Sequence, residues 1–348
     1  MSPTLLTIII SSLGLGTTLT FIGSHWLLVW MGLEINTLAI IPMMIHQHHP
    51  RAVEATTKYF LTQATASALL LFASVTNAWA MGEWSLFEMT YPTSATLATI
   101  ALALKIGLAP LHFWLPEVLQ GLDLTTGLIL ATWQKLAPFA ILIQLAPLLN
   151  PNLLMTLGVL STIVGGWGGL NQTQLRKILA YSSIANLGWM ITIMHYSVPL
   201  TQLNLLLYIF MTLTTFLLFK TFNSTNMSSI ASSSSKAPIL SIMALMTLLS
   251  LGGLPPLSGF IPKWLILQEM TKQNLAIPAT IMALMALLSL FFYLRLCYTT
   301  TLTMAPNPTN MSTSWRTKPP LSNLTMTLLS SLSILLLPLT PALLTLAS

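Results

Sequence analysis

Long apolar runs alternate with short polar stretches along almost the whole chain of 348 residues. A helix that crosses a membrane needs about 20 mostly apolar residues, and eleven segments of this kind can be marked off. They run over 3–22, 25–45, 57–81, 94–119, 124–147, 152–170, 174–195, 200–220, 238–270, 277–302 and 322–346. The pattern predicts an all-α polytopic membrane protein with about eleven transmembrane helices.

Two of these segments contain the same motif, G-L-x-P-L-x-x-x-x-P, at 107–116 and at 253–262. Proline removes a backbone donor and clashes with the preceding turn, so we expect both helices to break there. The segments are the fourth and the ninth, and an offset of five helices reverses the direction of the chain. We therefore predict a single membrane domain of two inverted five-helix repeats. The repeats would cover residues 1–150 and 151–302, with a loop and one C-terminal helix over 303–348.

An alternative is that the motif repeats by chance, because glycine and proline are common in membrane helices. The stretch 221–237 is the one long polar, low-complexity segment, and we interpret it as a flexible surface loop.

The basic residues between the segments indicate an orientation, because Lys and Arg concentrate on the side where the chain is made. Loops that follow even-numbered helices hold Arg51, Lys58, Arg176, Lys177, Lys220, Lys236, Arg316 and Lys318, whereas the odd-numbered loops hold only Lys272. This asymmetry supports eleven helices and places the N-terminus on the positive side.

Four charged residues lie deep inside predicted helices, where each costs roughly 2.5–3.5 kcal/mol on insertion scales. Glu34, Lys105 and Lys135 are near the middle of their segments, and Lys263 follows the second proline of the second motif. One glutamate could pair with one lysine merely to neutralise buried charge, but three lysines and one glutamate cannot all be paired. Titratable groups at this depth are typical of a proton relay.

Helix dipoles distinguish two of these lysines. Lys105 ends a half-helix, where the dipole favours a cation, whereas Lys263 begins one, where the dipole opposes a cation. His112 lies within the first motif and could transfer protons through its two ring nitrogens, or could be a hydrogen-bonded packing residue. Both interpretations of His112 stay open here. We expect Glu117 and Arg295 to be structural.

Composition narrows the function classes further. Only 6% of residues are charged, against roughly 25% in soluble domains, and the scattered basic residues form no run that would suggest nucleic-acid binding. A single cysteine provides no disulfide and no thiolate cluster. His46, His48 and His49 have no partner in a metal-ligand spacing, so we expect a solvated turn. No nucleotide, flavin or metal motif is present in the sequence.

Several segments together resemble a known family. These are WMGLEINTLAIIP (30–42), KYFLTQATAS (58–67), ALKIGLAPLHFWLPEV (103–118), TWQKLAP (132–138), GGLNQTQLRKILAYSSIANLGWM (168–190) and LSLGGLPPLSGFIPKW (249–264). They are similar to the subunit 2 family of mitochondrial NADH:ubiquinone oxidoreductase, respiratory complex I. The resemblance covers nearly the whole chain.

The resemblance implies an antiporter-like subunit of the membrane arm, in the multi-pass form that has eleven helices. It also implies a charge pair between Glu34 and Lys105, matches Lys135 and Lys263 to the family's buried lysines, and matches His112 to a histidine of the central hydrated axis. The chain would carry no cofactor, since FMN, iron–sulfur clusters and ubiquinone would be bound by other subunits.

The family further implies a location in the mitochondrial inner membrane, with the N-terminus in the matrix. Its partners would be other membrane-arm subunits of complex I and membrane lipids, without nucleic acid. The chain would couple NADH:ubiquinone oxidoreduction, catalysed elsewhere in the complex, to proton translocation. Two alternatives are a freestanding cation/proton antiporter and a scaffold whose buried charges only transmit electrostatic changes.

Overall fold

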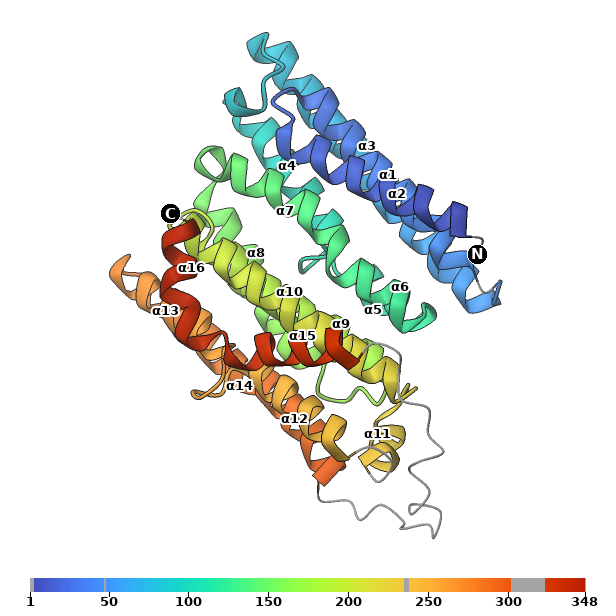
Figure 1. Cartoon of the computed structure of the whole chain (residues 1–348). Coiled ribbons are helices and arrows are strands. Elements are labelled where there is room, and N and C mark those ends of the chain that lie inside the picture. The colour runs from blue at the N-terminus through green and yellow to red at the C-terminus, as the bar shows by residue number, and fades with distance from the viewer. Residues whose placement is uncertain (1–2, 47, 235–237, 302–322, 348) are drawn as a thin grey trace. The chain divides into compact units, whose positions relative to one another are not determined.

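The protein consists of helices packed in two compact units, residues 1–160 and 161–348. The computed structural model describes residues 3–46, 48–234, 238–301 and 323–347, and no β-strand occurs among them (Figure 1). The all-α prediction is therefore confirmed for the described part of the chain. Lys236, Arg316 and Lys318, which entered the orientation argument, lie outside these residues.

The first unit contains α1 to α7 and the start of α8. The helices are α1 (Pro3–Ile22), α2 (Trp26–Ile45), α3 (Pro50–Met81), α4 (Pro92–Ile106), α5 (Trp114–Gly121), α6 (Leu124–Ala131), α7 (Trp133–Leu145) and α8 (Pro151–Gly168), with short 3-10 turns at Leu86–Glu88 and Ala146–Leu148. Close packing of α1 against α2 depends on small residues, since a methyl group on Gly16 would meet Asn36 and the Gly32 carbonyl.

The second unit contains the remainder. Its helices are α9 (Leu175–Ile193), α10 (Val198–Thr221), α11 (Met227–Ser234), α12 (Pro238–Gly252), α13 (Phe260–Lys272), α14 (Ala276–Thr301), α15 (Asn323–Leu335) and α16 (Thr340–Ala347), with a 3-10 turn at Leu337–Leu339 between the last two. In this unit α10 lies beside α12, α15 and α16.

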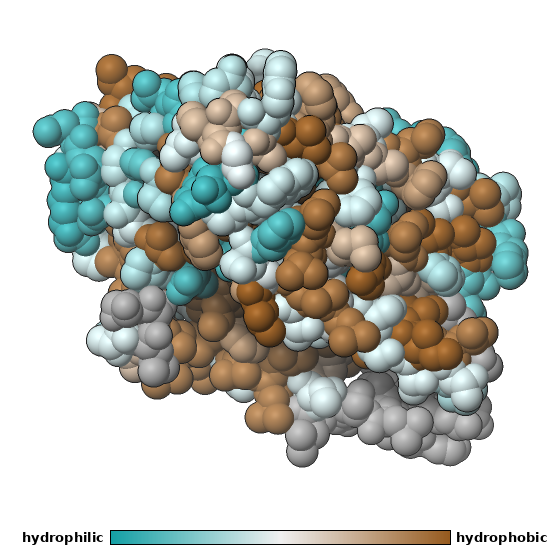
Figure 2. Space-filling view, turned by 90° about the horizontal axis from the view of Figure 1, so that it is seen from above, coloured by the Kyte–Doolittle hydropathy of each residue, from teal (hydrophilic) through white to brown (hydrophobic). Residues whose placement is uncertain are grey.

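Six described helices are long and apolar enough to cross a membrane as continuous spans, and a seventh span results if the bent C-terminal pair is counted as one. Exposed large apolar side chains on these helices, such as Ile22, Phe72 and Leu287, fit a lipid-facing surface. Figure 2 shows hydrophobic residues, in brown, over wide areas of the surface.

Both G-L-x-P-L motifs interrupt a helix. The first separates α4 from α5 at residues 107–113, and the second separates α12 from α13 at residues 253–259. Each break starts at a glycine with positive φ, +85° at Gly107 and +84° at Gly253, a conformation that costs glycine little. The shorter half-helices explain why neither motif segment appears among the six continuous spans.

Two segments differ from the sequence prediction, and a third has a local irregularity. Residues 124–148 form one continuous span, as predicted, but α6 ends and α7 begins at Thr132 (φ −114°, ψ −69°) within it. The predicted C-terminal helix is bent by 64° between α15 and α16, next to Pro338, whose missing N–H prevents a regular helix. The prediction of a flexible loop over 221–237 is wrong for 227–234, where α11 buries Met227 and Ile230.

The loops that are rich in basic residues, and were predicted to share one side of the membrane, lie at one end within each unit. In the first unit the start of α1 lies at the same end as the start of α3, which carries Arg51 and Lys58 (Figure 1). In the second unit, backbone hydrogen bonds from Leu175 to Thr225 and from Met227 to Thr173 join the loop before α9 to the loop after α10. The basic residues next to those two loops, Arg176, Lys177 and Lys220, therefore share one end of the unit.

Candidate functional site

Two of the predicted lysines line one internal cavity in the first unit. Lys105, in the last turn of α4, and Lys135, in the first turn of α7, are each 5% exposed. Both contribute to a cavity of about 20 Å³. A water molecule needs roughly 10–15 Å³ of such space, so about one water fits between these helices.

The other polar residues of this cavity are uncharged. They are Asn36 and Thr37 from α2, Tyr59 and Gln63 from α3, and Gln134 from α7. The Gln134 side-chain amide donates to the Asn36 carbonyl at 3.1 Å, which ties α7 to α2. Apolar residues such as Leu33, Leu115 and Leu130 complete the lining. These uncharged residues were not among the predicted site residues, because their only signal in the sequence is a polar side chain within an apolar segment.

Glu34 lies close to this cavity on α2 but makes no direct ion pair with Lys105. Among the described residues the Oε2 atom of Glu34 and the Nζ atom of Lys105 are both buried without a hydrogen-bond partner. Glu34 nevertheless interacts electrostatically with Lys105 and with Tyr59. The charge pair that the resemblance implied is therefore present as an electrostatic interaction, without a salt bridge between the two side chains.

Uncharged side chains satisfy the last carbonyls of α4 at the first break. The Gln63 amide donates to the Lys105 carbonyl at 3.2 Å, and the Trp114 indole donates to the Leu104 carbonyl at 3.0 Å. The last four carbonyls of a helix have no partner within it, so such donors are needed at a buried helix end. The Lys105 ammonium is not among the groups that bind these carbonyls.

At the second break, unlike at the first, the lysine ammonium itself binds the carbonyls that end the preceding half-helix. It lies in the first turn of α13, but its ammonium reaches back to donate to the carbonyls of Gly252 at 2.9 Å and Leu251 at 3.3 Å. These carbonyls end α12, where the helix dipole favours a cation. The argument that the dipole opposes a charge on Lys263 is therefore wrong, because the side chain interacts with the preceding half-helix.

His112 lies in the first break and is 5% exposed, but it is not part of the cavity lining. Its ring packs against Phe113 with centroids 4.3 Å apart, and its side chain interacts with the backbone of Pro110. These contacts fit the interpretation as a hydrogen-bonded packing residue. A role in proton transfer stays a prediction.

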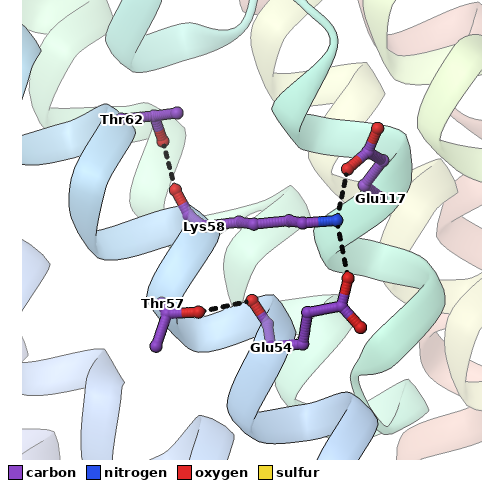
Figure 3. Close-up of polar contacts among 5 residues, drawn as sticks. All are labelled: Glu54, Thr57, Lys58, Thr62 and Glu117. Atoms are coloured by element: carbon purple, nitrogen blue, oxygen red, sulfur yellow. Dashed lines mark hydrogen bonds and ion pairs between the residues drawn. The ribbon is translucent and has the colours of Figure 1, made fainter.

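An exposed ion-pair cluster fixes the half-helix that follows the first break (Figure 3). The Lys58 ammonium on α3 is 2.8 Å from a carboxylate oxygen of Glu54, one turn away, and 2.8 Å from one of Glu117 on α5. Glu117 therefore has the structural role expected of it. Arg295 also does, since its guanidinium donates to the Leu170 carbonyl just after α8.

No group of three or more potential metal ligands among His, Cys, Asp and Glu occurs within the described residues. In the histidine-rich turn, the His49 imidazole accepts from the Arg51 amide and caps the start of α3. The candidate site is thus a set of buried lysines with polar neighbours.

Two broken helices with lysines at their breaks are features of transporter-like polytopic membrane proteins. The family profile described as the NADH:quinone oxidoreductase/Mrp antiporter transmembrane family matches residues 23–289, and the profile of the NADH dehydrogenase subunit 2 C-terminus matches residues 290–344. The chain belongs to the subunit 2 family of NADH:ubiquinone oxidoreductase. The resemblance found in the sequence is confirmed.

Individual relatives agree with this assignment. The chain is 81% identical to NADH-ubiquinone oxidoreductase chain 2 of Scyliorhinus canicula over 99% of both chains. It is 64% identical to the chain of that name from Salmo salar, again over 99% of both. Among solved structures it resembles a chain of respiratory complex I from Thermus thermophilus, with 28% identity and a TM-score of 0.81, covering 95% of this chain and 78% of that one. A chain of the Mrp complex from Dietzia, at 15% identity and a TM-score of 0.82, shows the same fold.

Proposed function

We propose that this chain is a core membrane-arm subunit of respiratory complex I and couples NADH:ubiquinone oxidoreduction, catalysed by other subunits, to proton translocation. The observation that carries the proposal is the cavity shared by Lys105 and Lys135, with the Glu34 charge nearby. Family membership identifies the complex in which the chain works, and the buried charges are the groups that couple electron transfer to proton movement. FMN, iron–sulfur clusters and ubiquinone belong to partner subunits in this proposal.

The relay uses Glu34, Lys105 and Lys135 in the first unit and Lys263 in the second, with His112 as a further candidate. A change in charge at Glu34 alters the electrostatic stabilisation of the Lys105 ammonium, which can then exchange a proton through a water in the cavity. Gln63, Gln134 and Tyr59 provide polar atoms around that space, and a buried water usually makes about three hydrogen bonds. Lys135 accepts the proton on the other side of this water.

The membrane arrangement is part of the same proposal. Eleven spans in two inverted five-helix repeats, with the broken fourth and ninth spans each made of two half-helices, accommodate both the motif spacing and the loop charges. The N-terminus lies in the matrix of a mitochondrial inner-membrane protein, and lipid covers the exposed apolar side chains.

Replacing each buried lysine by methionine tests the relay. In the assembled complex we expect Lys105→Met, Lys135→Met and Lys263→Met to lower quinone-linked turnover several-fold or to reduce the number of protons moved per NADH oxidised. Lys272→Met is the matched control, because Lys272 is exposed and pairs with Glu269. Normal turnover with full proton stoichiometry in all three variants would rule out the relay.

A freestanding cation/proton antiporter is the alternative, and purification separates the two. A complex I subunit should copurify with NADH dehydrogenase activity, whereas an antiporter should run alone or as a homodimer. The scaffold alternative would instead leave the proton stoichiometry intact in the methionine variants.

A further inference from the structure

The bent C-terminal helix contacts the second helix break through one hydrogen bond. Ser258, in the break between α12 and α13, donates its hydroxyl proton to the backbone carbonyl of Ser333 in α15. Both residues are completely buried. The two residues are 75 positions apart in sequence, so this is a tertiary contact within the second unit.

The Ser258 hydroxyl differs in this respect from most serine and threonine hydroxyls of the described helices. Those of Ser250, Ser289 and Ser330, for example, donate to a carbonyl three residues earlier in their own helix. Such a local bond adds nothing to the fixation of one element against another. The Ser258 bond, in contrast, joins a non-helical segment to a separate helix.

The bend explains why the Ser333 carbonyl is available. In a straight helix this carbonyl would accept from the amide of Leu337, but α15 ends at Leu335 and the described backbone bonds include none between these two residues. Proline at 338 removes the next donor and disfavours continuation of the helix. A carbonyl freed at membrane depth needs another partner, and a serine side chain is a common one.

The second break is tightly packed around the residues that Ser258 holds. A methyl group on Gly259 would overlap the Ser250 carbonyl oxygen, and one on Gly253 would lie 3.1 Å from the Lys263 Nζ atom. Lys263 in turn binds the last carbonyls of α12. Displacement of Ser258 would therefore shift the backbone that supports the Lys263 contacts.

We propose that the bent helix pair α15–α16 is a positioning element for the second break, and that the Ser258–Ser333 hydrogen bond is the contact through which it acts on Lys263. The bend is then a requirement of the site, because it frees the carbonyl to which Ser258 donates. The effect on coupling rests on the proposed function, whereas the effect on the break itself does not.

The test compares Ser258→Ala with Ser289→Ala in the assembled complex. Hydrogen–deuterium exchange is measured over residues 253–262, and protons moved per NADH oxidised are measured on the same preparations. We expect exchange in this segment to be several-fold faster and the proton ratio to be lower in Ser258→Ala only. Wild-type exchange of the segment in Ser258→Ala would overturn the proposal.

A second variant keeps the test decisive if Ser258→Ala does not assemble. Pro338→Ala allows the helix to straighten, so that Ser333 pairs with Leu337 and Ser258 loses its acceptor. We expect the same faster exchange over 253–262, with no further increase in the double variant Ser258→Ala/Pro338→Ala. Pro341→Ala, in the first turn of α16, is the control. Unchanged exchange in Pro338→Ala, or additive effects in the double variant, would contradict the proposal.

The two proposals can fail separately. If Lys263→Met has normal proton stoichiometry, the relay role of Lys263 fails, but the exchange measurement still reports whether α15 holds the break. If exchange is unaffected while Lys263→Met loses coupling, the relay stands and the positioning role fails.

Discussion

The two lysines next to the helix breaks have different surroundings although the motif repeats. The last carbonyls of α4 accept hydrogen bonds from Gln63 and Trp114, and Lys105 contributes to a cavity. At the second break, the Lys263 ammonium itself donates to the last carbonyls of α12. An ammonium next to a water-sized space can exchange its proton without first breaking bonds to the protein. The two hydrogen bonds of the Lys263 ammonium instead favour a charge that is held at the end of α12.

Gln63 gives a prediction at the scale of one side chain. Gln63→Leu removes the donor to the Lys105 carbonyl, and an unsatisfied buried carbonyl costs about 1–3 kcal/mol. We expect a lower temperature of thermal inactivation for the assembled complex, together with altered turnover because Lys105 is less well held. Gln268→Leu is the control, since Gln268 is exposed. Equal thermal stability of the two variants would count against this role for Gln63.

Among the helices, an interruption could be predicted from the sequence only where a helix-breaking residue marks it. Glycine and proline stand in both motifs, so both breaks could be predicted. Neither residue stands at Thr132, so the irregularity between α6 and α7 had no such signal in the sequence. The serine-rich stretch has the composition of an unstructured loop. Its apolar residues Met227 and Ile230, however, have the three-residue spacing of one helix face, and their burial anchors α11.

The second break also allows a prediction about backbone contact. Gly259→Ala places a methyl group against the Ser250 carbonyl, and a backbone atom cannot move aside as a flexible side chain would. We expect little or no assembled complex with this variant, measured as complex I content on native gels. Gly14→Ala should assemble normally, because nothing lies within 4 Å of the added methyl group. Normal assembly of Gly259→Ala would show that the break can widen.

At the scale of the whole molecule, the charged members of the site could be found one by one, but their neighbours could not. A charge deep in an apolar segment is conspicuous in sequence, as for Lys105 and Lys135. Gln63 and Gln134 are ordinary polar residues until the packing of α3, α4 and α7 brings them to one cavity.

The orientation of the first unit can be tested by chemical labelling. The start of α3 and the start of α4 lie at opposite ends of this unit, and Val53 and Thr93 are exposed there. In mitoplasts, a membrane-impermeant maleimide should label Thr93→Cys from outside, and Val53→Cys only after permeabilisation. The one native cysteine, Cys297, is buried and gives little background. Labelling of Val53→Cys alone in intact mitoplasts would reverse the proposed orientation.

The glycine that starts the second break has a consequence for sequence variation between species. Gly82 and Gly253 share a positive φ, but a side chain at Gly82 would meet open space, whereas one at Gly253 would press on the Lys263 ammonium. Asparagine tolerates this backbone conformation, so evolution can exchange Gly82 at modest cost. At Gly253 any such exchange would also require the Lys263 side chain to give way by a few tenths of an ångström, so variation there is more constrained than at Gly82 in lineages that retain the lysine.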